Sequence, residues 1–467
     1  MLGRQGVQFG VTMLLAYLLS PKDFGLMAML GVFLALGSTM MDSGFTQALI
    51  RLDNPGQKDY STAFYTNLLL GLVVYCLLFA TSPLIASFYE EPKLTVLVRV
   101  VGLAIVFNAF QMVQVAKLSR ALNFKAQLQA TLPASVLSGG GAIFLASLGL
   151  GVWALVGQML TSAILVTLFL WMQRIWRPSF EFSGQSLMGM YQFGYKLFLS
   201  GVIATVFKNL YVLAIAKSFS IGEAGMYFFA DKVKDMLVMQ MVAAIQNVTY
   251  PALATKKNNV ALLKGSSRKL IRVMTFFLFP FLLVFSALTP VVFELFLPEK
   301  WGAASFYLQL MIVASLMAPI NSVNLNILKV VGRSDLFLFL EVLKKSMLAI
   351  ILFFSIDFGV VGVMVGQIVQ SFLGAIINSF FTKKLIGYSL REQVSDFFPA
   401  LFLASIIAGF VFFGQFEFYY PPILELIAFS VMSAIFYLSI SKILGFSQLN
   451  FFISLLFNRF SKKTRAI

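Results

Sequence analysis

Lys208 and Asn209 are polar side chains near the middle of a long apolar stretch, residues 191–216. A charged side chain at the centre of a lipid bilayer costs roughly 2.5–3.5 kcal/mol on insertion scales, so it usually faces a cavity or a partner. Lys208 and Asn209 can have either of two roles. The lysine and amide can hold an anionic ligand, or the lysine can form a buried ion pair with another helix.

A second group of charges is spaced for pairing on one helix face, at Asp231, Lys232, Lys234 and Asp235. At 100° per residue they fall within an arc of about 160°. Charges three residues apart on a helix can pair. We therefore expect a self-neutralised polar face that lines water and is extended by Gln246, with a merely interfacial helix end as the alternative.

Other candidates are distributed over three stretches. Glu341, Lys344 and Lys345 resemble the second group, although these lysines could also snorkel to the interface. Asp42 has no nearby cation in its own helix, so it is a candidate for binding H⁺ or Na⁺, with a hydrogen bond between helices as the alternative. The predicted ligand contacts are Lys208, Asn209, Lys232, Lys234, Lys344, Lys345, Asn108 and Gln111, and the predicted ion-coupling residues are Asp42, Asp231, Asp235 and Glu341.

The composition excludes most soluble enzymes. Of 467 residues, 59% are apolar and 12% are charged, whereas soluble domains carry about 25% charged residues. The chain has no histidine and one cysteine, Cys76. We therefore expect no catalytic residues, no metal site and no cofactor.

Apolar stretches of about 17–25 residues recur along the whole chain. We interpret them as membrane-spanning helices, because barrel strands are only about 10 residues long. The connections are short, so no sizeable extramembrane domain is expected. The fourteen predicted spans are 4–20, 25–49, 61–82, 95–116, 127–148, 151–173, 191–216, 224–250, 270–290, 303–328, 336–356, 359–381, 397–415 and 421–445.

Basic residues predict which side of the membrane each connection faces. With a cytoplasmic N-terminus, 23 cations lie inside and four outside, which places both termini in the cytoplasm. The net charge of +16 is thus mostly a topology signal, and we expect no nucleic-acid partner. The outside cations are Lys22, Lys93, Lys217 and Lys300; the inside ones include the cluster Lys256, Lys257, Lys264, Arg268, Lys269 and Arg272, which would attract anionic lipid headgroups.

Two sequence matches predict an internal duplication. Ser20–Leu26 matches Ser220–Met226, and each copy has the S-x-x-[DE] pattern of a helix capping box. Gly151–Gln158 resembles Val360–Gln367 at a similar offset, although glycine-rich helix starts can look alike by composition. We expect an all-α polytopic membrane protein with two six-helix lobes around a central cavity. The predicted regions are 1–175 and 190–385 for the lobes, 396–446 for an extra helix pair and 447–467 for a basic cytoplasmic tail.

Six stretches of the chain resemble a known family, the Wzx-type oligosaccharide flippases of the multidrug/oligosaccharidyl-lipid/polysaccharide exporter superfamily, and in particular the colanic-acid-type exporters. Many members have a basic residue in the first span where this chain has Leu15-Ala16-Tyr17, so no cationic contact is carried over to position 17. The resembling stretches are Leu18–Leu26, Asp42–Ile50, Asp59–Tyr65, Gly151–Val156, Gly332–Phe337 and Leu385–Leu390.

This resemblance implies a function in the bacterial cytoplasmic (inner) membrane. The expected activity is export of an oligosaccharide repeat unit carried on undecaprenyl pyrophosphate, with no bond made or broken. The partners implied are the lipid-linked oligosaccharide, the lipid bilayer, and a polysaccharide polymerase with its chain-length machinery. The alternatives are a multidrug or cation exporter of the same superfamily, which would favour an acidic cavity, and a membrane-embedded glycan polymerase or transferase, which would need a sizeable catalytic loop.

Overall fold

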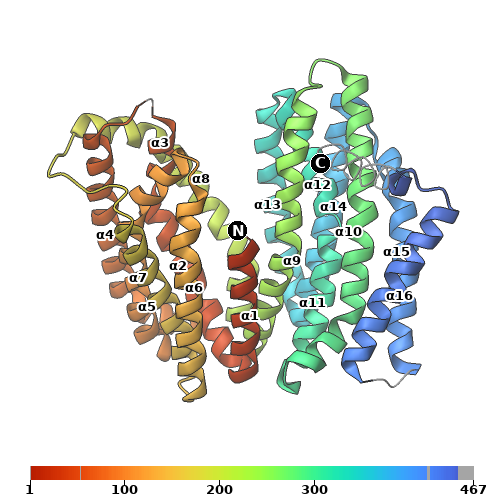
Figure 1. Ribbon diagram of the computed structural model, residues 1–467, viewed down its shortest axis with the longest axis horizontal. Helices are drawn as coiled ribbons and strands as arrows, with labels where there is room; N and C mark the ends of the chain where they lie inside the picture. The colour runs from red at the N-terminus through yellow and green to blue at the C-terminus, as the bar shows by residue number, and fades with distance from the viewer. Residues whose placement is uncertain (1, 53, 418–420, 451–467) are drawn as a thin grey trace, which may run out of the picture. The chain divides into compact units, whose positions relative to one another are not determined.

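The computed structural model describes residues 2–52, 54–417 and 421–450, and within them the fold is helical (Figure 1). The predicted residues 451–467 of the tail lie outside this part. The helices are α1 (Leu2–Leu18), α2 (Pro21–Asp42), α3 (Phe45–Arg51), α4 (Gln57–Tyr89), α5 (Lys93–Arg120), α6 (Phe124–Ser147), α7 (Val152–Met172), α8 (Gly184–Ser218), α9 (Ile221–Ala254), α10 (Val260–Phe296), η1 (Glu299–Trp301), α11 (Gly302–Ser315), α12 (Ala318–Val331), α13 (Ser334–Ser355), η2 (Ile356–Phe358), α14 (Gly359–Ile386), α15 (Leu390–Glu417) and α16 (Pro422–Ile443).

The helices agree with the predicted spans, and the fold class of an all-helical polytopic membrane protein is confirmed. Within the described residues, eleven helical stretches are long and apolar enough to cross a membrane, one of which joins α13 and α14. Two predicted spans are interrupted: 25–49 breaks between α2 and α3, and 303–328 breaks between α11 and α12. Several helices are longer than the roughly 30 Å thickness of the hydrocarbon core. For example, the 37 residues of α10 extend about 55 Å at about 1.5 Å per residue.

Both predicted capping boxes are present. At the start of α2, the backbone N–H of Ser20 donates to Asp23 at 2.9 Å, and the N–H of Asp23 donates back to the Ser20 hydroxyl at 3.3 Å. Ser220 and Glu223 repeat the arrangement at the start of α9, at 3.0 and 3.2 Å. Each box satisfies backbone donors that the first helical turn leaves without a partner.

The chain divides into two compact units, Met1–Phe229 (unit 1) and Ala230–Ile467 (unit 2). This division differs from the predicted lobe limits, because α8 packs on α2, α3 and α4 of unit 1 instead of belonging to the second body. The physical reason is a close approach of backbones: a Cβ on Gly194 of α8 would lie 2.7 Å from the carbonyl oxygen of Ser43. The limits of the lobes as repeated sequence units stay a prediction.

The order of helix packing repeats between the two units. In unit 1, α5 contacts α4 and α7, and α6 contacts α7. In unit 2, α11 contacts α10 and α14, and α13 contacts α14. The pair α15 and α16 is added on α10, where the hydroxyl of Tyr437 donates to the carbonyl of Phe276 at 2.8 Å.

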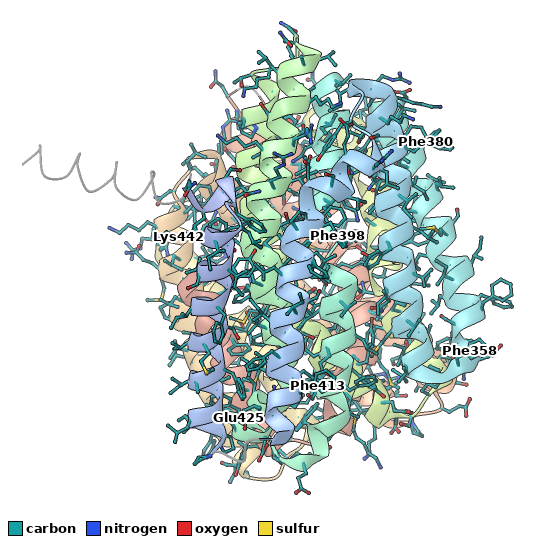
Figure 2. All side chains as sticks on the ribbon, turned by 90° about the vertical axis from the view of Figure 1, so that its right-hand side faces the viewer. Phe358, Phe380, Phe398, Phe413, Glu425 and Lys442 are labelled. Carbon is teal, nitrogen blue, oxygen red and sulfur yellow. The ribbon has the colours of Figure 1, made fainter. Side chains whose placement is uncertain are left out.

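Large apolar side chains cover the outer surface of unit 2. Figure 2 labels Phe358, Phe380, Phe398 and Phe413, which are between 50% and 78% exposed. In water such a surface would favour association, whereas in a bilayer it faces lipid tails of equal polarity. The same view labels Glu425 and Lys442 near the two ends of α16; Glu425 is buried, whereas Lys442 is exposed and can reach the headgroups.

The first turns of α2 and α9 cross in direct backbone contact inside unit 1. A Cβ on Gly25 would lie 1.9 Å from the carbonyl oxygen of Ile221, and a Cβ on Gly225 would lie 1.7 Å from that of Pro21. Pro21 and Ile221 are 200 residues apart, and so are Gly25 and Gly225. Each glycine therefore meets the counterpart of the residue that the other glycine meets, as in a local two-fold arrangement. Phe24 and Phe229 pack edge to face beside it, with ring centroids 5.7 Å apart. Only glycine fits at either position.

We expect Gly225→Ala to destabilise the protein, because the added methyl group would force the two helices apart. Overpacking of this kind costs about 1–3 kcal/mol. The matched control is Gly31→Ala in α2, where a Cβ meets no atom within 4 Å and where alanine favours the helix by about 0.5–1 kcal/mol. The melting temperature of the purified protein in detergent measures both. Equal melting temperatures for Gly225→Ala and the unmodified protein would contradict the close crossing.

Candidate functional site

The seam between α2 and α8 positions two of the predicted site residues. The helices run antiparallel, because Gly44 lies against Gly194 and the hydroxyls of Thr39 and Thr205 are 3.0 Å apart. Asp42 lies one turn beyond Thr39, and Lys208 lies one turn beyond Thr205 in the opposite direction. The two residues are therefore separated by about 9 Å along the seam, which places them at neighbouring levels of the same helix pair.

Lys208 is exposed and deep in the helix. It lies nine residues before Lys217, which corresponds to about 13 Å along α8. Lys217 itself pairs with Glu90 at 2.8 Å, where both side chains are exposed, and this ion pair lowers the pKa of Glu90 below its usual range. No salt bridge to Lys208 is found among the residues that the structure describes. Both roles predicted for Lys208, a ligand contact and a buried ion pair, stay predictions.

Asp42 lies where α2 ends and α3 begins. Ser43 and Gly44 adopt left-handed conformations at the break, with φ of 43° and 77°. The Asp42 carboxylate then accepts hydrogen bonds from the Thr46 hydroxyl at 2.7 Å and the Thr46 backbone N–H at 3.4 Å. Asp42 thus caps the first turn of α3, so it has a local structural role besides the predicted coupling role.

The amide candidates of unit 1 are engaged in packing. The side-chain amide of Gln111 donates to Asn108 at 3.1 Å and to the Ala163 carbonyl and the Thr167 hydroxyl at 3.0 Å each. These bonds join α5 to α7. Asn209 donates to the carbonyl of Thr205 in its own helix at 2.7 Å. The contacts therefore favour a structural role for these amides, and their predicted role as ligand contacts stays a prediction.

The charged group of α9 is largely neutralised by a lysine. The ammonium of Lys234 pairs with Asp231, as the spacing predicts, and also lies 3.2 Å from Asp235. These three side chains are half-buried, whereas Lys232 is exposed. Gln246 is exposed too, and its amide lies 3.4 Å from the Ser322 hydroxyl of α12. The self-neutralised polar face is thus present, and its contact with water stays a prediction.

The group of α13 pairs in the same way. The ammonium of Lys344 lies 2.6 Å from Glu341, three residues earlier, and both side chains are mostly covered. The stem of Lys344 packs toward Gly374 of α14. Lys345 is half-buried on the same helix. Because Glu341 neutralises Lys344, this group has less positive charge to offer a ligand than its lysines suggest.

A buried carboxylate in unit 2 was not predicted. Asp396 of α15 has no exposed side-chain surface and accepts from the Nε atoms of Arg268 and Arg272 of α10, each at 2.8 Å. The hydroxyl of Tyr388 donates to it at 2.8 Å. Asp396 lies one residue before the predicted span 397–415, so the sequence around it does not indicate a buried charge. Arg268 and Arg272 are four residues apart on one helix face, and this spacing could have indicated a buried acidic partner.

A polar cluster around α12 also lacks a strong sequence signal. Asn324 donates to Gln393 of α15 at 3.0 Å, and Ser379 of α14 donates to the same oxygen at 2.9 Å. Asn326 donates to Thr249 of α9 at 2.7 Å. These buried amides join four helices, and hydrogen bonds between spans hold membrane helices together. No group of three metal-ligating side chains is found in the described part of the chain.

Among the described residues, Lys208 forms no salt bridge, whereas the charged groups of α9 and α13 are largely neutralised by internal pairs. A cation without an ion-pair partner can bind an anion. A family model described as "Polysaccharide biosynthesis protein" matches residues 14–306, which is more than half of the chain. The chain belongs to the polysaccharide biosynthesis protein family.

The relatives of this polysaccharide biosynthesis protein are named as biosynthesis and transport proteins. The lipopolysaccharide biosynthesis protein WzxC of Escherichia coli (strain K12) is 26% identical over 413 residues, which is 86% of this chain and 84% of that protein. The succinoglycan biosynthesis transport protein ExoT of Rhizobium meliloti (strain 1021) is 22% identical over 406 residues, covering 86% and 80%. The chain is thus a multi-pass helical membrane protein of a polysaccharide biosynthesis family.

A solved structure shares the fold. The lipid II flippase MurJ in an inward closed conformation superposes on the polysaccharide biosynthesis protein with a TM-score of 0.76 at 13% identity, covering 94% of this chain and 96% of that one. This similarity confirms the predicted all-helical membrane fold. The family model shows a polysaccharide biosynthesis family, and the closer kinship with Wzx-type flippases and colanic-acid-type exporters stays a prediction.

We expect Asp396→Ala to destabilise unit 2, because two guanidinium groups lose their shared carboxylate. Breaking a buried pair costs about 3–5 kcal/mol, and about 2–3 kcal/mol is expected here because Arg268 and Arg272 are 33% and 41% exposed and can turn toward water. Asp335→Ala is the matched control, since it breaks an exposed arginine pair, which water screens and which therefore contributes little to stability. Thermal unfolding in detergent compares the two. Similar losses in both variants would contradict a special role for Asp396.

Proposed function

We propose that this transporter translocates an oligosaccharide repeat unit linked to undecaprenyl pyrophosphate across the bacterial cytoplasmic membrane by alternating access. The exported unit would serve exopolysaccharide, capsule or O-antigen synthesis. Both termini lie in the cytoplasm in this proposal, in accordance with the basic residues of the predicted inside connections. A polysaccharide polymerase and its chain-length machinery receive the unit on the outer side.

Lys208 is the observation that supports the proposal most directly. An exposed lysine about 13 Å along the helix from an exposed ion pair is too deep for easy snorkelling. If its ammonium faced hydrocarbon, the cost would be roughly 2.5–3.5 kcal/mol, so a hydrated surface or an anionic ligand is the favourable neighbour. A pyrophosphate provides oxygen acceptors and negative charge for such a group.

The physical mechanism needs no covalent chemistry. The positive charge of Lys208 offsets part of the desolvation of the pyrophosphate, while the polyprenyl tail stays in lipid. Exposed polar side chains such as Lys232 and Gln246 keep part of the surface hydrated for the sugar. A change between two conformations then exposes the same site to the other side of the membrane. Asp42 is proposed to bind the H⁺ or Na⁺ that drives this change.

Lys208→Ala is expected to reduce transport by about tenfold or more, which corresponds to about 1.4 kcal/mol of lost contact with the pyrophosphate. The measurement is uptake of a defined undecaprenyl-pyrophosphate oligosaccharide into proteoliposomes. Lys208→Arg keeps the charge and should retain part of the activity. Lys442→Ala removes an exposed lysine of α16 and serves as the control. Full transport by Lys208→Ala would remove this residue from the site.

Asp42→Asn is expected to abolish the response of transport to an imposed proton or sodium gradient. Asparagine caps a helix as well as aspartate does, so the melting temperature should stay the same. Thr46→Val is the matched control, because it removes the hydroxyl bond to Asp42 and leaves the carboxylate in place. A variant Asp42→Asn that still follows the gradient as the unmodified protein does would disprove the coupling role.

The proposal as a whole has its own test in cells. Deletion of the gene should stop display of the polymer and should leave lipid-linked repeat units on the inner leaflet. Normal polymer without such accumulation would refute the flippase function. Drug resistance on overexpression, with normal polymer, would favour the multidrug exporter instead.

A further inference from the structure

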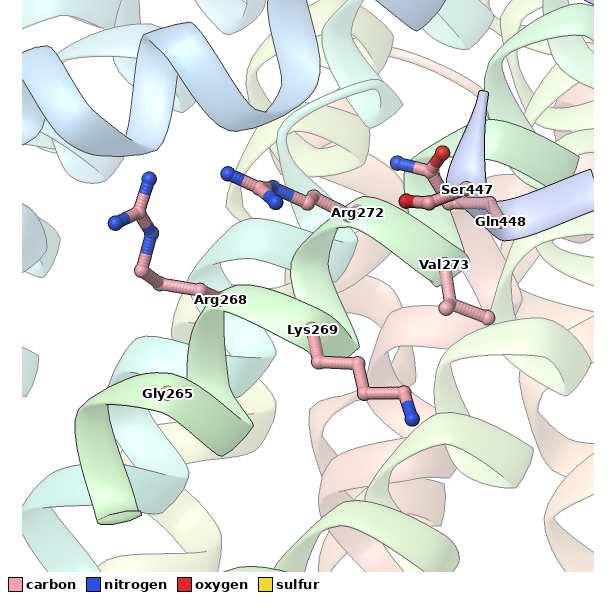
Figure 3. A pocket seen from close by; sticks show the side chains of 7 residues that line it. All are labelled: Gly265, Arg268, Lys269, Arg272, Val273, Ser447 and Gln448. Carbon is pink, nitrogen blue, oxygen red and sulfur yellow. The ribbon is translucent and has the colours of Figure 1, made fainter. Parts of the chain in front are cut away.

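The N-terminal half of α10 carries a pocket that the proposed function does not use. Its volume is about 420 Å³, within the range of about 300–1,000 Å³ typical of small-molecule sites. Its lining residues are Gly265, Arg268, Lys269, Arg272, Val273, Ser447 and Gln448. Figure 3 shows Arg268 and Arg272 pointing to one side of α10 and Lys269 to the other. Three cations and two side chains with hydrogen-bond donors thus surround one opening.

Positive charge exceeds negative charge around this pocket. The described residues that line the pocket or pair with its lining include four cations, Lys264, Arg268, Lys269 and Arg272, and two carboxylates, Glu392 and Asp396. The arginines are also held in place, since both bind Asp396 through two nitrogens each. Nη1 of Arg272 has no hydrogen-bond partner among the described residues, and a guanidinium retains donors beyond those two nitrogens. Such a wall is a pre-organised receptor for oxygen anions, and arginine suits phosphate in particular.

The opposite wall is fixed by the segment that follows α16. The ring of Phe446 packs on Phe276 of α10 with centroids 5.9 Å apart, and Leu449 is buried. Ser447 and Gln448 lie between these two anchors and therefore stay beside α10. Gly265 is part of the lining, and a Cβ there would meet no atom within 4 Å, so this position opens directly into the pocket.

The surroundings of the pocket are those of a membrane interface. Ile443 and Leu444, just before Ser447, are 83% and 60% exposed. In a protein that crosses the bilayer, such side chains contact acyl chains. Because α10 is about 25 Å longer than the hydrocarbon core, its basic first turns can lie at the headgroups while its remainder spans the membrane. The pocket thus places phosphate-binding donors beside a surface that lipid tails cover.

We propose that this pocket binds a phosphate group, and that the phosphate belongs to the headgroup of an anionic phospholipid. Ligand binding here would join α10 to the segment that follows α16, since the lining comes from both. The site is separate from Lys208, which belongs to unit 1.

The experiment is a thermal-shift titration of the full chain in a neutral detergent. Phosphatidylglycerol should raise the melting temperature in a saturable manner, whereas phosphatidylcholine, which carries no net charge, should leave it unchanged. Inorganic phosphate is the arm that distinguishes the source. A shift by phosphatidylglycerol alone supports a lipid headgroup, and an equal shift by inorganic phosphate would overturn the lipid source in favour of a soluble phosphate compound.

Two variants test whether the effect arises in the pocket. Gly265→Trp fills the opening without removing a charge and should weaken the apparent affinity for phosphatidylglycerol about tenfold, the effect of about 1.4 kcal/mol. Gly265→Ala, which adds only a methyl group, should bind as the unmodified protein does. Unweakened binding by Gly265→Trp would overturn the proposal.

A charge reversal keeps the test valid if the tryptophan variant does not fold. Lys269→Glu should weaken phosphatidylglycerol binding to a similar degree. Lys257→Glu makes the same charge change at an exposed residue outside the lining and should bind normally. Equal weakening in both variants would indicate a general charge effect and would overturn the specific pocket.

Discussion

Hydrocarbon offers no hydrogen bonds, and this constraint determines where each polar side chain of the protein can lie. Most of the described backbone lies in helices, which satisfy their own backbone groups, and some helix starts are completed by capping boxes such as Ser20 with Asp23. Charges within the spans are neutralised locally, as in the pair of Glu341 with Lys344. The pattern makes an unpaired charge informative. Lys208 is a predicted site residue that forms no salt bridge among the described residues.

The constraint also explains why amides occur at helix contacts. In water, an exposed amide gains little by bonding to a neighbour, because water replaces the bond at low cost. Between spans no water is present to replace a lost hydrogen bond, so amides bond across helices. Gln111 joins α5 to α7, and Asn324 joins α12 to α15. Each of these contacts fixes the register of two helices. Because these amide contacts hold the helices together, a few charged side chains can lie within the spans without loss of the fold.

The sequence predicted the helices well and their contacts poorly, for a physical reason. Long apolar runs and capping residues are local signals, so they indicated the spans and the starts of α2 and α9. The break after Asp42 was missed, because Ser43 and Gly44 do not interrupt the apolar pattern of 25–49. The pairing of Asp396 with Arg268 joins residues 128 positions apart, and a single sequence contains no signal for a contact between residues so far apart in the chain. Candidate residues were predicted where the burial of a single charge is costly, and the carboxylate that two arginines share, Asp396, was not predicted.

The crossing of α2 and α9 has an electrostatic consequence. The N-terminal end of a helix carries roughly half a positive charge, and here two such ends meet almost without separation. Their repulsion is offset because each first turn includes its own carboxylate, Asp23 in one and Glu223 in the other. The two copies of the repeat therefore depend on each other in charge as well as in shape. A neutral residue at either position would leave the partner helix beside an unbalanced dipole.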